Sequence, residues 1–164
     1  MTGTSEDFSG WYEAAWPRIV RAVTVYLGSP SDAADIAAEA ATRALARWDG
    51  PDRPADPTTW AIVVAINLAK RRGRRDQRGR ELGAGQPAAV DRSAVELGAT
   101  DLDVWDAVQG LAPREREAVA LRYGSDLTEP AVADAMGITP GAVAATLHRA
   151  RTKLRAALSE THHG

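Results

Sequence analysis

The segment that most constrains the fold spans residues 127–154, LTEPAVADAMGITPGAVAATLHRARTKL. Within it, Ala133, Gly137 and Val143 stand at relative spacings of four and six. An alanine lets two helices approach closely, a glycine at the turn permits a positive φ, and a valine packs the second helix onto the first. The spacing therefore predicts a helix-turn-helix unit, with Thr139 capping its second helix.

Basic residues extend the second helix of this unit. Cations at a helix end suit contact with DNA phosphates, but a solvated helix end has the same composition. An ordinary helical hairpin can also match the spacing by chance, so both interpretations stay open at this point. The basic residues are Arg149, Arg151, Lys153 and Arg155, and the expected core of the unit is completed by Val132, Met136, Ile138 and Leu147.

Composition favours helices in the rest of the chain. Of 164 residues, 45% are hydrophobic and 26% are charged, but only 5% are aromatic, and alanine is abundant. Such a chain packs helices closely rather than forming sheets, so we expect an all-α protein of one ordinary domain or two small ones. The chain has no cysteine, which excludes a disulfide framework, a thiolate nucleophile and a cysteine metal site.

Two helices are predicted near the N-terminus. The first carries an apolar stripe at helical spacing, in which Pro17 should cause a kink or a restart. The second begins after Ser29, a capping hydroxyl, with Pro30 in the first helical position. The stripe consists of Trp11, Ala15, Ile19, Val23 and Tyr26 or Leu27.

A proline-rich loop, DGPDRPADP, follows these two helices. Asp56 and Pro57 then begin a third helix, which is apolar to Leu68 and basic from Lys70, so its first half should be buried and its end should project outward. Residues 76–100 show no steady period and are predicted to be a linker. A second helical set is expected over Leu102–Gly110, Pro113–Tyr123, Thr128–Met136 and Thr139 to about Leu158.

Charge is unevenly distributed, although the formal net charge is only −2. The stretch from Lys70 to Arg80 holds seven basic residues and one acid, whereas the stretch from Asp32 to Asp56 holds six acids and three arginines. Polyanions respond to local clusters of cations. A mildly acidic chain can therefore still bind nucleic acid through particular segments.

Three segments together resemble a known family. The stretch LAPREREAVALRYGSDLTEPAVADAMGITPGAVAATLHRARTKLRAAL resembles the C-terminal domain of the extracytoplasmic-function (ECF) sigma factors of bacterial RNA polymerase. SDAADIAAEAATRALARW looks like the polymerase-binding helix of that family, and PTTWAIVVAINLAKRRGRR looks like its promoter-melting helix. The resemblance implies a region 2-like domain over residues 8–75, a flexible linker over 76–100 and a region 4-like helix-turn-helix domain over 101–158.

The resemblance also implies roles for particular residues. The second helix would dock on the largest polymerase subunit. The loop 49–57 would help to form a pocket for a base flipped out of the minus-ten element. The linker would thread through the polymerase toward the RNA exit path and leave the two DNA-binding domains separately positioned. The implied residues are Asp35, Ile36, Glu39 and Arg43 for core polymerase; Asn67, Lys70, Arg71, Arg74 and Arg75 for minus-ten DNA; and Arg122, Thr139, Gly141, Ala142, Ala145, Thr146, His148, Arg149 and Arg151 for minus-thirty-five DNA.

These features predict a transcription initiation factor that binds core RNA polymerase and promoter DNA, with an anti-sigma factor as a possible partner and a monomer as the free state. Two alternatives stay open. A stand-alone helix-turn-helix regulator would need dimer symmetry. A sigma-like interaction protein with weakened promoter reading is suggested by the alanines at 38, 41, 144 and 145, where the family commonly has larger or polar residues.

Several function classes have no support in the sequence. No paired nucleophile and base, phosphate-binding loop or metal-ligand spacing occurs, so we expect no enzymatic activity and no cofactor. His162 and His163 lack a third partner for a metal. The polar, acidic start MTGTSEDFSG and the short apolar runs predict neither a secretory signal nor membrane insertion, and hence a cytoplasmic protein.

Overall fold

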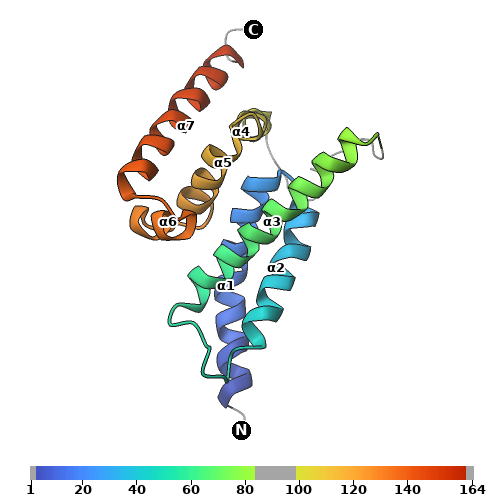
Figure 1. Ribbon diagram of the computed structural model, residues 1–164, viewed down its shortest axis with the longest axis vertical. Coiled ribbons are helices and arrows are strands. Elements are labelled where there is room, and N and C mark those ends of the chain that lie inside the picture. The colour runs from blue at the N-terminus through green and yellow to red at the C-terminus, as the bar shows by residue number, and fades with distance from the viewer. Residues whose placement is uncertain (1–2, 84–98, 162–164) are drawn as a thin grey trace.

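The computed structural model describes residues 3–83 and 99–161, and all regular structure in these ranges is helical (Figure 1). This confirms the all-α prediction. Most of the predicted linker and the pair His162 and His163 lie outside the described residues. The helices are α1 (Gly3–Leu27), α2 (Pro30–Leu45), α3 (Pro57–Glu81), α4 (Ala99–Gln109), α5 (Pro113–Val119), the π-helix η1 (Ala120–Gly124), α6 (Glu129–Met136) and α7 (Pro140–Thr161).

The first domain consists of α1, α2 and α3, which pack against one another. Its core combines a few branched side chains with many fully buried alanines, and the alanines allow the helix backbones to approach closely. Helix α1 continues through Pro17 without a restart. The largest buried side chains of this core are Ile19, Val23, Ile62 and Ile66.

Local signals fix where α2 and α3 begin. Asp32 donates its backbone N–H to the hydroxyl of Ser29 at 3.4 Å, and Pro30 occupies the first turn of α2. Asp56 caps α3 in the same way, accepting from the backbone N–H of Thr59 at 3.1 Å. Both predicted starts are confirmed. Helix α3 runs on to Glu81, into the segment predicted as a linker, because its arginines, glutamine and glutamate are good helix formers.

The second domain consists of α4, α5, η1, α6 and α7. The sequence predicted one continuous helix from Pro113 to Tyr123, but the α-helix ends at Val119 and the chain continues as a π-turn. Ser125 donates its backbone N–H to the carbonyl of Ala120, and its hydroxyl donates to the carbonyl of Leu121 at 2.7 Å. The wider turn brings Gly124 against the first domain.

The two domains pack together rather than standing apart. Helix α1 contacts η1, α4 and α5, and Figure 1 shows the second domain beside the upper part of α1. The resemblance implied that the two DNA-binding domains are separately positioned on polymerase. In this structure of the chain alone they share an interface, which α1 forms with η1, α4 and α5.

Candidate nucleic-acid interface

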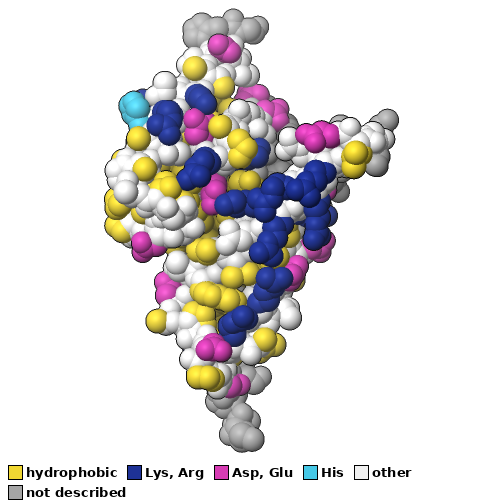
Figure 2. Space-filling model, viewed as in Figure 1, with side chains coloured by type: hydrophobic (Ala, Val, Ile, Leu, Met, Phe, Trp, Pro, Cys, Tyr) yellow, Lys and Arg dark blue, Asp and Glu magenta, His cyan; other side chains and the backbone are white. Residues whose placement is uncertain are grey.

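The outer face of α3 carries exposed basic side chains. The first half of the helix is anchored by buried apolar residues such as Ile62 and Ile66, so its second half projects with fixed orientation. Figure 2 shows Lys and Arg side chains gathered in a band over this side of the molecule. Asn67, Arg71, Arg74 and Arg75 are exposed, and Lys70 is half-buried.

Only some of these cations have partners. Arg72 forms an ion pair with Asp32 of α2 at 2.6 Å, and Lys70 forms one with Glu117 of the second domain at 3.1 Å. Within the described part of the chain, no ion pair engages the exposed Arg71, Arg74 or Arg75 of α3. Their charge is therefore available to an external anion.

The outer face of α2 lies beside this basic face. Asp35 and Glu39 are exposed, and Glu39 accepts from Arg43 one turn later at 2.6 Å. Ile36 is only 5% exposed and packs in the core, so it supports α2 from within. A groove between α2 and α3 is lined by Glu39, Arg43, Arg71, Arg72 and Arg75 among others.

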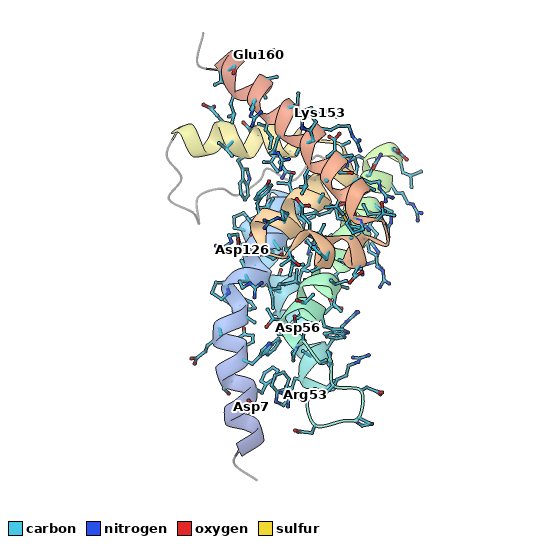
Figure 3. All side chains as sticks on the ribbon, turned by 90° about the vertical axis from the view of Figure 1, so that its left-hand side faces the viewer. Asp7, Arg53, Asp56, Asp126, Lys153 and Glu160 are labelled. Carbon is cyan, nitrogen blue, oxygen red and sulfur yellow. The ribbon has the colours of Figure 1, made fainter. Side chains whose placement is uncertain are left out.

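The loop between α2 and α3 is anchored on aromatic rings. Trp48 is buried against Phe8 and Trp11, with ring centroids 5.1 Å from each. Arg53 lies over the Trp48 ring at 4.0 Å and pairs with Asp7 at 3.2 Å (Figure 3). The indole N–H of Trp48 has no hydrogen-bond partner among the described residues. These contacts fix the base of the loop.

Asp56 links this loop to α3. The hydroxyl of Thr59 donates to one carboxylate oxygen at 2.6 Å, and the backbone N–H of Thr59 donates to the other. The hydroxyl bond is the main reason that the pKa of Asp56 lies below its ordinary value. The carboxylate thus caps α3 in its charged form at neutral pH.

The helix-turn-helix unit has the predicted geometry. Gly137 ends α6 with a φ of 66°, the left-handed conformation for which a glycine was expected. Thr139 caps α7 by accepting from the backbone N–H of Ala142 at 3.1 Å. Val143 is fully buried. The predicted core is confirmed, with Val132 and Leu147 fully buried and Met136 and Ile138 packed against them.

The outer face of α7 is sparse in polar groups. Thr146 is buried, and its hydroxyl donates to the carbonyl of Ala142 at 2.7 Å, so it faces inward. Arg151 donates to the hydroxyl of Tyr123 at 2.8 Å, and Arg122 donates to the carbonyl of Leu127 at 3.2 Å. The exposed predicted residues are Thr139, Gly141, Ala145, His148 and Arg149, and Ala142 is half-exposed.

A buried carboxylate on α5 holds α7 in place. Glu115 is 6% exposed and accepts two bonds of 2.9 Å from Lys153, while Arg149 lies 4.0 Å away. It also accepts from the backbone N–H of Ala112. The Lys153 bond is the largest cause that lowers the pKa of Glu115, whereas desolvation opposes it.

Sequence reasoning did not single out Glu115, Glu117 or Arg72. A signal existed for Glu115, since a glutamate at the third helical position after a proline-started turn is typical of a helix-capping residue. The partner of Glu117 lies in the other domain, 47 positions away. No local pattern encodes such a contact.

Two further features are absent from the described residues. Across residues 3–83 and 99–161, no group of three His, Asp or Glu side chains is arranged to hold a metal ion. In the same ranges, no helix combines the length and the apolar character needed to cross a membrane.

Comparisons with known proteins match both domains in order. Residues 11–79 match the model of sigma-70 region 2, and residues 101–154 match that of sigma-70 region 4. The RNA polymerase sigma-E factor of Streptomyces avermitilis is 30% identical over 153 residues, which cover 91% of this chain and 83% of the relative. That of Streptomyces antibioticus is 32% identical over 129 residues, covering 77% of this chain and 70% of the relative.

Solved structures share the fold at lower identity. The sigma factor RpoE of Bartonella quintana, solved with the anti-sigma factor NepR, has a TM-score of 0.76 at 22% identity, covering 94% of this chain and 98% of its own. CnrH, solved with the cytosolic domain of CnrY, has a TM-score of 0.68 at 20% identity, covering 97% of this chain and 92% of its own. With the region 2 and region 4 matches and the identity to sigma-E factors, the chain belongs to the ECF group of sigma-70-family RNA polymerase sigma factors, which direct promoter recognition and transcription initiation.

Proposed function

We propose that this chain is a dissociable, non-catalytic subunit of RNA polymerase that binds the minus-ten element through α3 and the minus-thirty-five element through α7. The observation that carries the proposal is the exposed face of α3, where Arg71, Arg74 and Arg75 have no ion-pair partner among the described residues. Because these three cations are exposed to solvent on a rigid helix, they form a surface that can bind DNA phosphates.

At the minus-ten element, Asn67 would contact a base and the arginines would contact the DNA backbone. Asn67 lies one turn before Arg71 on the exposed side of α3, so its amide can bond a base edge while the cations hold the backbone. Lys70 would join them once its carboxylate partner, Glu117, is removed. The loop that begins after Trp48 would bind the unstacked base. This binding would offset the cost of unstacking, roughly a few kcal/mol.

At the minus-thirty-five element, α7 would recognise DNA more through apolar contacts and shape complementarity than through hydrogen bonds to bases. Ala142 and Ala145 present methyl groups that fit the methyl group of thymine. His148 and Arg149 stand on the exposed side and suit phosphate contact. Thr146 faces inward and Gly141 has no side chain, so base discrimination by this helix should be modest.

The outer face of α2 would dock on core polymerase. Asp35, Glu39 and Arg43 are accessible, and the Glu39–Arg43 pair is exposed enough to exchange its internal partner for an external one. Ile36 would support that face from the core. We expect the free protein to be a monomer, and we expect an anti-sigma partner because RpoE of Bartonella quintana was solved with the anti-sigma factor NepR.

The test is reconstituted transcription with core polymerase and mapped transcript starts. The wild-type chain should bind core and produce promoter-specific transcripts. The double variant Arg71→Ala, Arg74→Ala should keep core binding but lose promoter opening. Arg72→Ala is the matched control, because Arg72 lies on the same helix but is bound to Asp32. If the wild-type chain neither binds core nor supports transcription, the proposal is wrong.

A further inference from the structure

A groove lies between the second half of α3 and the second domain. It is lined by α3 on one side and by α4 and α5 on the other, and its volume is about 460 Å³. Small-molecule sites usually measure about 300–1,000 Å³. Figure 2 shows Lys and Arg side chains gathered where α3 meets the second domain. The cations that line the groove are Lys70, Arg74, Arg80, Arg114 and Arg116.

Positive charge dominates this groove. Among the described residues, five basic and two acidic side chains line it. The ion pair between Lys70 and Glu117 at 3.1 Å neutralises one of each, so four arginines remain with a single carboxylate, that of Asp76. In the described ranges, no ion pair engages any of these four arginines. The groove therefore attracts an anion from solution.

Arg116 is held in the groove by neutral groups. Its guanidinium carbon lies 5.0 Å from the centre of the Tyr26 ring, and its Nη1 donates to the backbone and side-chain oxygens of Gln109, both at 3.3 Å. Gln109 is itself fixed, because its amide donates to the carbonyl of Val25 at 2.9 Å. The buried Nε of Arg116 has no hydrogen-bond partner among the described residues. This half-buried charge lacks a carboxylate, and an anion would compensate it.

The other three arginines stand at the edge of the groove. Arg74 and Arg80 of α3 and Arg114 of α5 are exposed, so they can close on a ligand from both sides. A concave site with cations from two separate elements suits a compact ligand that carries several charges, rather than the convex backbone of a DNA duplex.

We propose that this groove is a binding site for a compact oligophosphate anion, held between the arginines of α3 and those of α5. The planar fork of an arginine donates two parallel hydrogen bonds to a phosphate group. The ring of Tyr26 is only 8% exposed and lies under Arg116, so it offers no free face on which a base could stack. Recognition therefore rests on the phosphate groups.

A ligand in the groove would also cover Lys70 and Arg74. It would compete with DNA for these two cations. This consequence rests on their proposed role at the minus-ten element, whereas the binding of the anion itself does not.

Gly73 allows the groove to be filled without a change of charge. It lines the groove, and a Cβ atom added to it meets nothing within 4 Å, so the side chain of Gly73→Leu would occupy the open space. Leucine is a better helix former than glycine, so α3 should stay folded. Gly79→Leu is the matched control, because a Cβ atom there also meets nothing within 4 Å and Gly79 lies on the same helix outside the groove lining.

Isothermal titration calorimetry of the full chain with inorganic triphosphate tests the site. At an ionic strength of about 0.15 M, the wild type and Gly79→Leu should bind one triphosphate per chain. Gly73→Leu should bind it about tenfold more weakly or not at all. A parallel titration with ATP distinguishes the sources of the ligand, because tighter binding of ATP would indicate a nucleoside polyphosphate and equal affinities an inorganic oligophosphate.

Two charge variants separate a specific site from general attraction of anions. Arg80→Gln, Arg114→Gln removes one cation from each side of the groove and should weaken triphosphate binding on the order of 100-fold, because each charge-assisted bond contributes about tenfold. Arg78→Gln, Arg155→Gln removes the same charge at two exposed positions outside the groove lining, and should stay within about threefold of the wild type. These variants keep the test decisive if a leucine variant misfolds.

The site is overturned if the wild type shows no saturable binding of either probe. It is also overturned if a folded Gly73→Leu variant binds as tightly as Gly79→Leu, or if both double variants lose affinity equally. A failure of the Arg71 and Arg74 variants in transcription would contradict the proposed function and leave the calorimetric result unaffected.

The competition is tested with a labelled DNA duplex of arbitrary sequence. Triphosphate at about ten times its Kd should raise the apparent Kd of the duplex about tenfold for Gly79→Leu. General screening by the added ions acts on both leucine variants, so only the smaller, shared rise is expected for Gly73→Leu. An equal rise in both variants would overturn the competition.

Discussion

The two helices that we propose bind promoter DNA, α3 and α7, are supported in opposite ways. Helix α3 is buried over its first half and projects over its second. There Lys70 and Arg72 form ion pairs, but Arg71, Arg74 and Arg75 have no ion-pair partner among the described residues. Helix α7 is held by Val143, Leu147 and Ala150 on the buried face of its first half. Three of its cations have internal partners: Lys153 binds the Glu115 carboxylate, Arg149 the Thr146 hydroxyl and Arg151 the Tyr123 phenol.

This difference indicates a division of labour. Unengaged cations give affinity that depends on salt and little on sequence. A helix whose cations already have internal partners gains less from phosphates, and it contributes through shape and methyl contacts instead. The first domain should therefore supply most of the electrostatic affinity for DNA. The second should mainly fix where the protein lies on the promoter.

The largest expected effect is on the α3 side of this comparison. Arg71→Ala, Arg74→Ala should weaken binding of the polymerase complex to promoter DNA on the order of 100-fold, because two phosphate contacts are lost. The slope of log K against log salt should fall by about 1.5 to 2. Arg149→Ala should lower it by about one at most, since Arg149 already donates to Thr146 at 3.2 Å. The measurement is a salt titration of fluorescence anisotropy.

Arg72→Ala again serves as the control, since its ion pair with Asp32 makes it a structural residue. Its salt slope should match that of the wild type. Equal slopes for the α3 and α7 variants would contradict the proposed difference between the two helices, because both would then contribute phosphate contacts equally.

Local signals were sufficient for much of this architecture. Ser29, Asp56 and Thr139 each identified a helix start, because a capping side chain acts within three residues. Gly137 identified the turn, because few residues other than glycine tolerate a positive φ. The resemblance to ECF sigma factors supplied the family, which the comparisons confirm, and the roles that it implied for single residues remain proposals.

The remaining features depend on contacts between distant parts of the chain. The π-turn at Ala120–Gly124 lies within a good helical pattern, and its bonding is coupled to the packing of Gly124 on Ala22. In the sequence, Lys70 is one more cation of a basic run. Its partner, Glu117 of the second domain, can be identified only from the structure. Thr146 looks like a polar recognition residue, but its hydroxyl bonds the preceding turn of its own helix.

A smaller effect is expected from the carboxylate that holds α7. Glu115→Gln should lower the free energy of unfolding by about 1–2 kcal/mol near neutral pH, a discounted value because Lys153 is half-exposed. The folded-state pKa of Glu115 is below its ordinary value of 4.5. Its contribution is therefore fully present above that value and is lost as the pH falls through the lowered folded pKa.

Urea unfolding of wild type and variant over a range of acid pH measures this effect. The difference between the two proteins should shrink as the pH falls below 4.5. Glu13→Gln, at an exposed position on α1, should show no such difference. A gap between wild type and Glu115→Gln that is constant with pH would show that packing, not the charge bonded to Lys153, anchors α7.

The smallest effect compares the turn glycines of the two domains. Gly137 and Gly28 have φ values of 66° and 73°, so alanine at either should cost about 1 kcal/mol of unfolding free energy in urea titrations. A Cβ atom on Gly137 meets nothing within 4 Å, whereas one on Gly28 lies 2.8 Å from the side chain of Gln109 in the other domain. Gly28→Ala alone should therefore also lengthen the distance between spin labels on the two domains, attached at Ala14→Cys and Ala156→Cys, because Gln109 must leave the end of α1. Equal distances in both variants would mean that Gln109 rotates aside without weakening the interface.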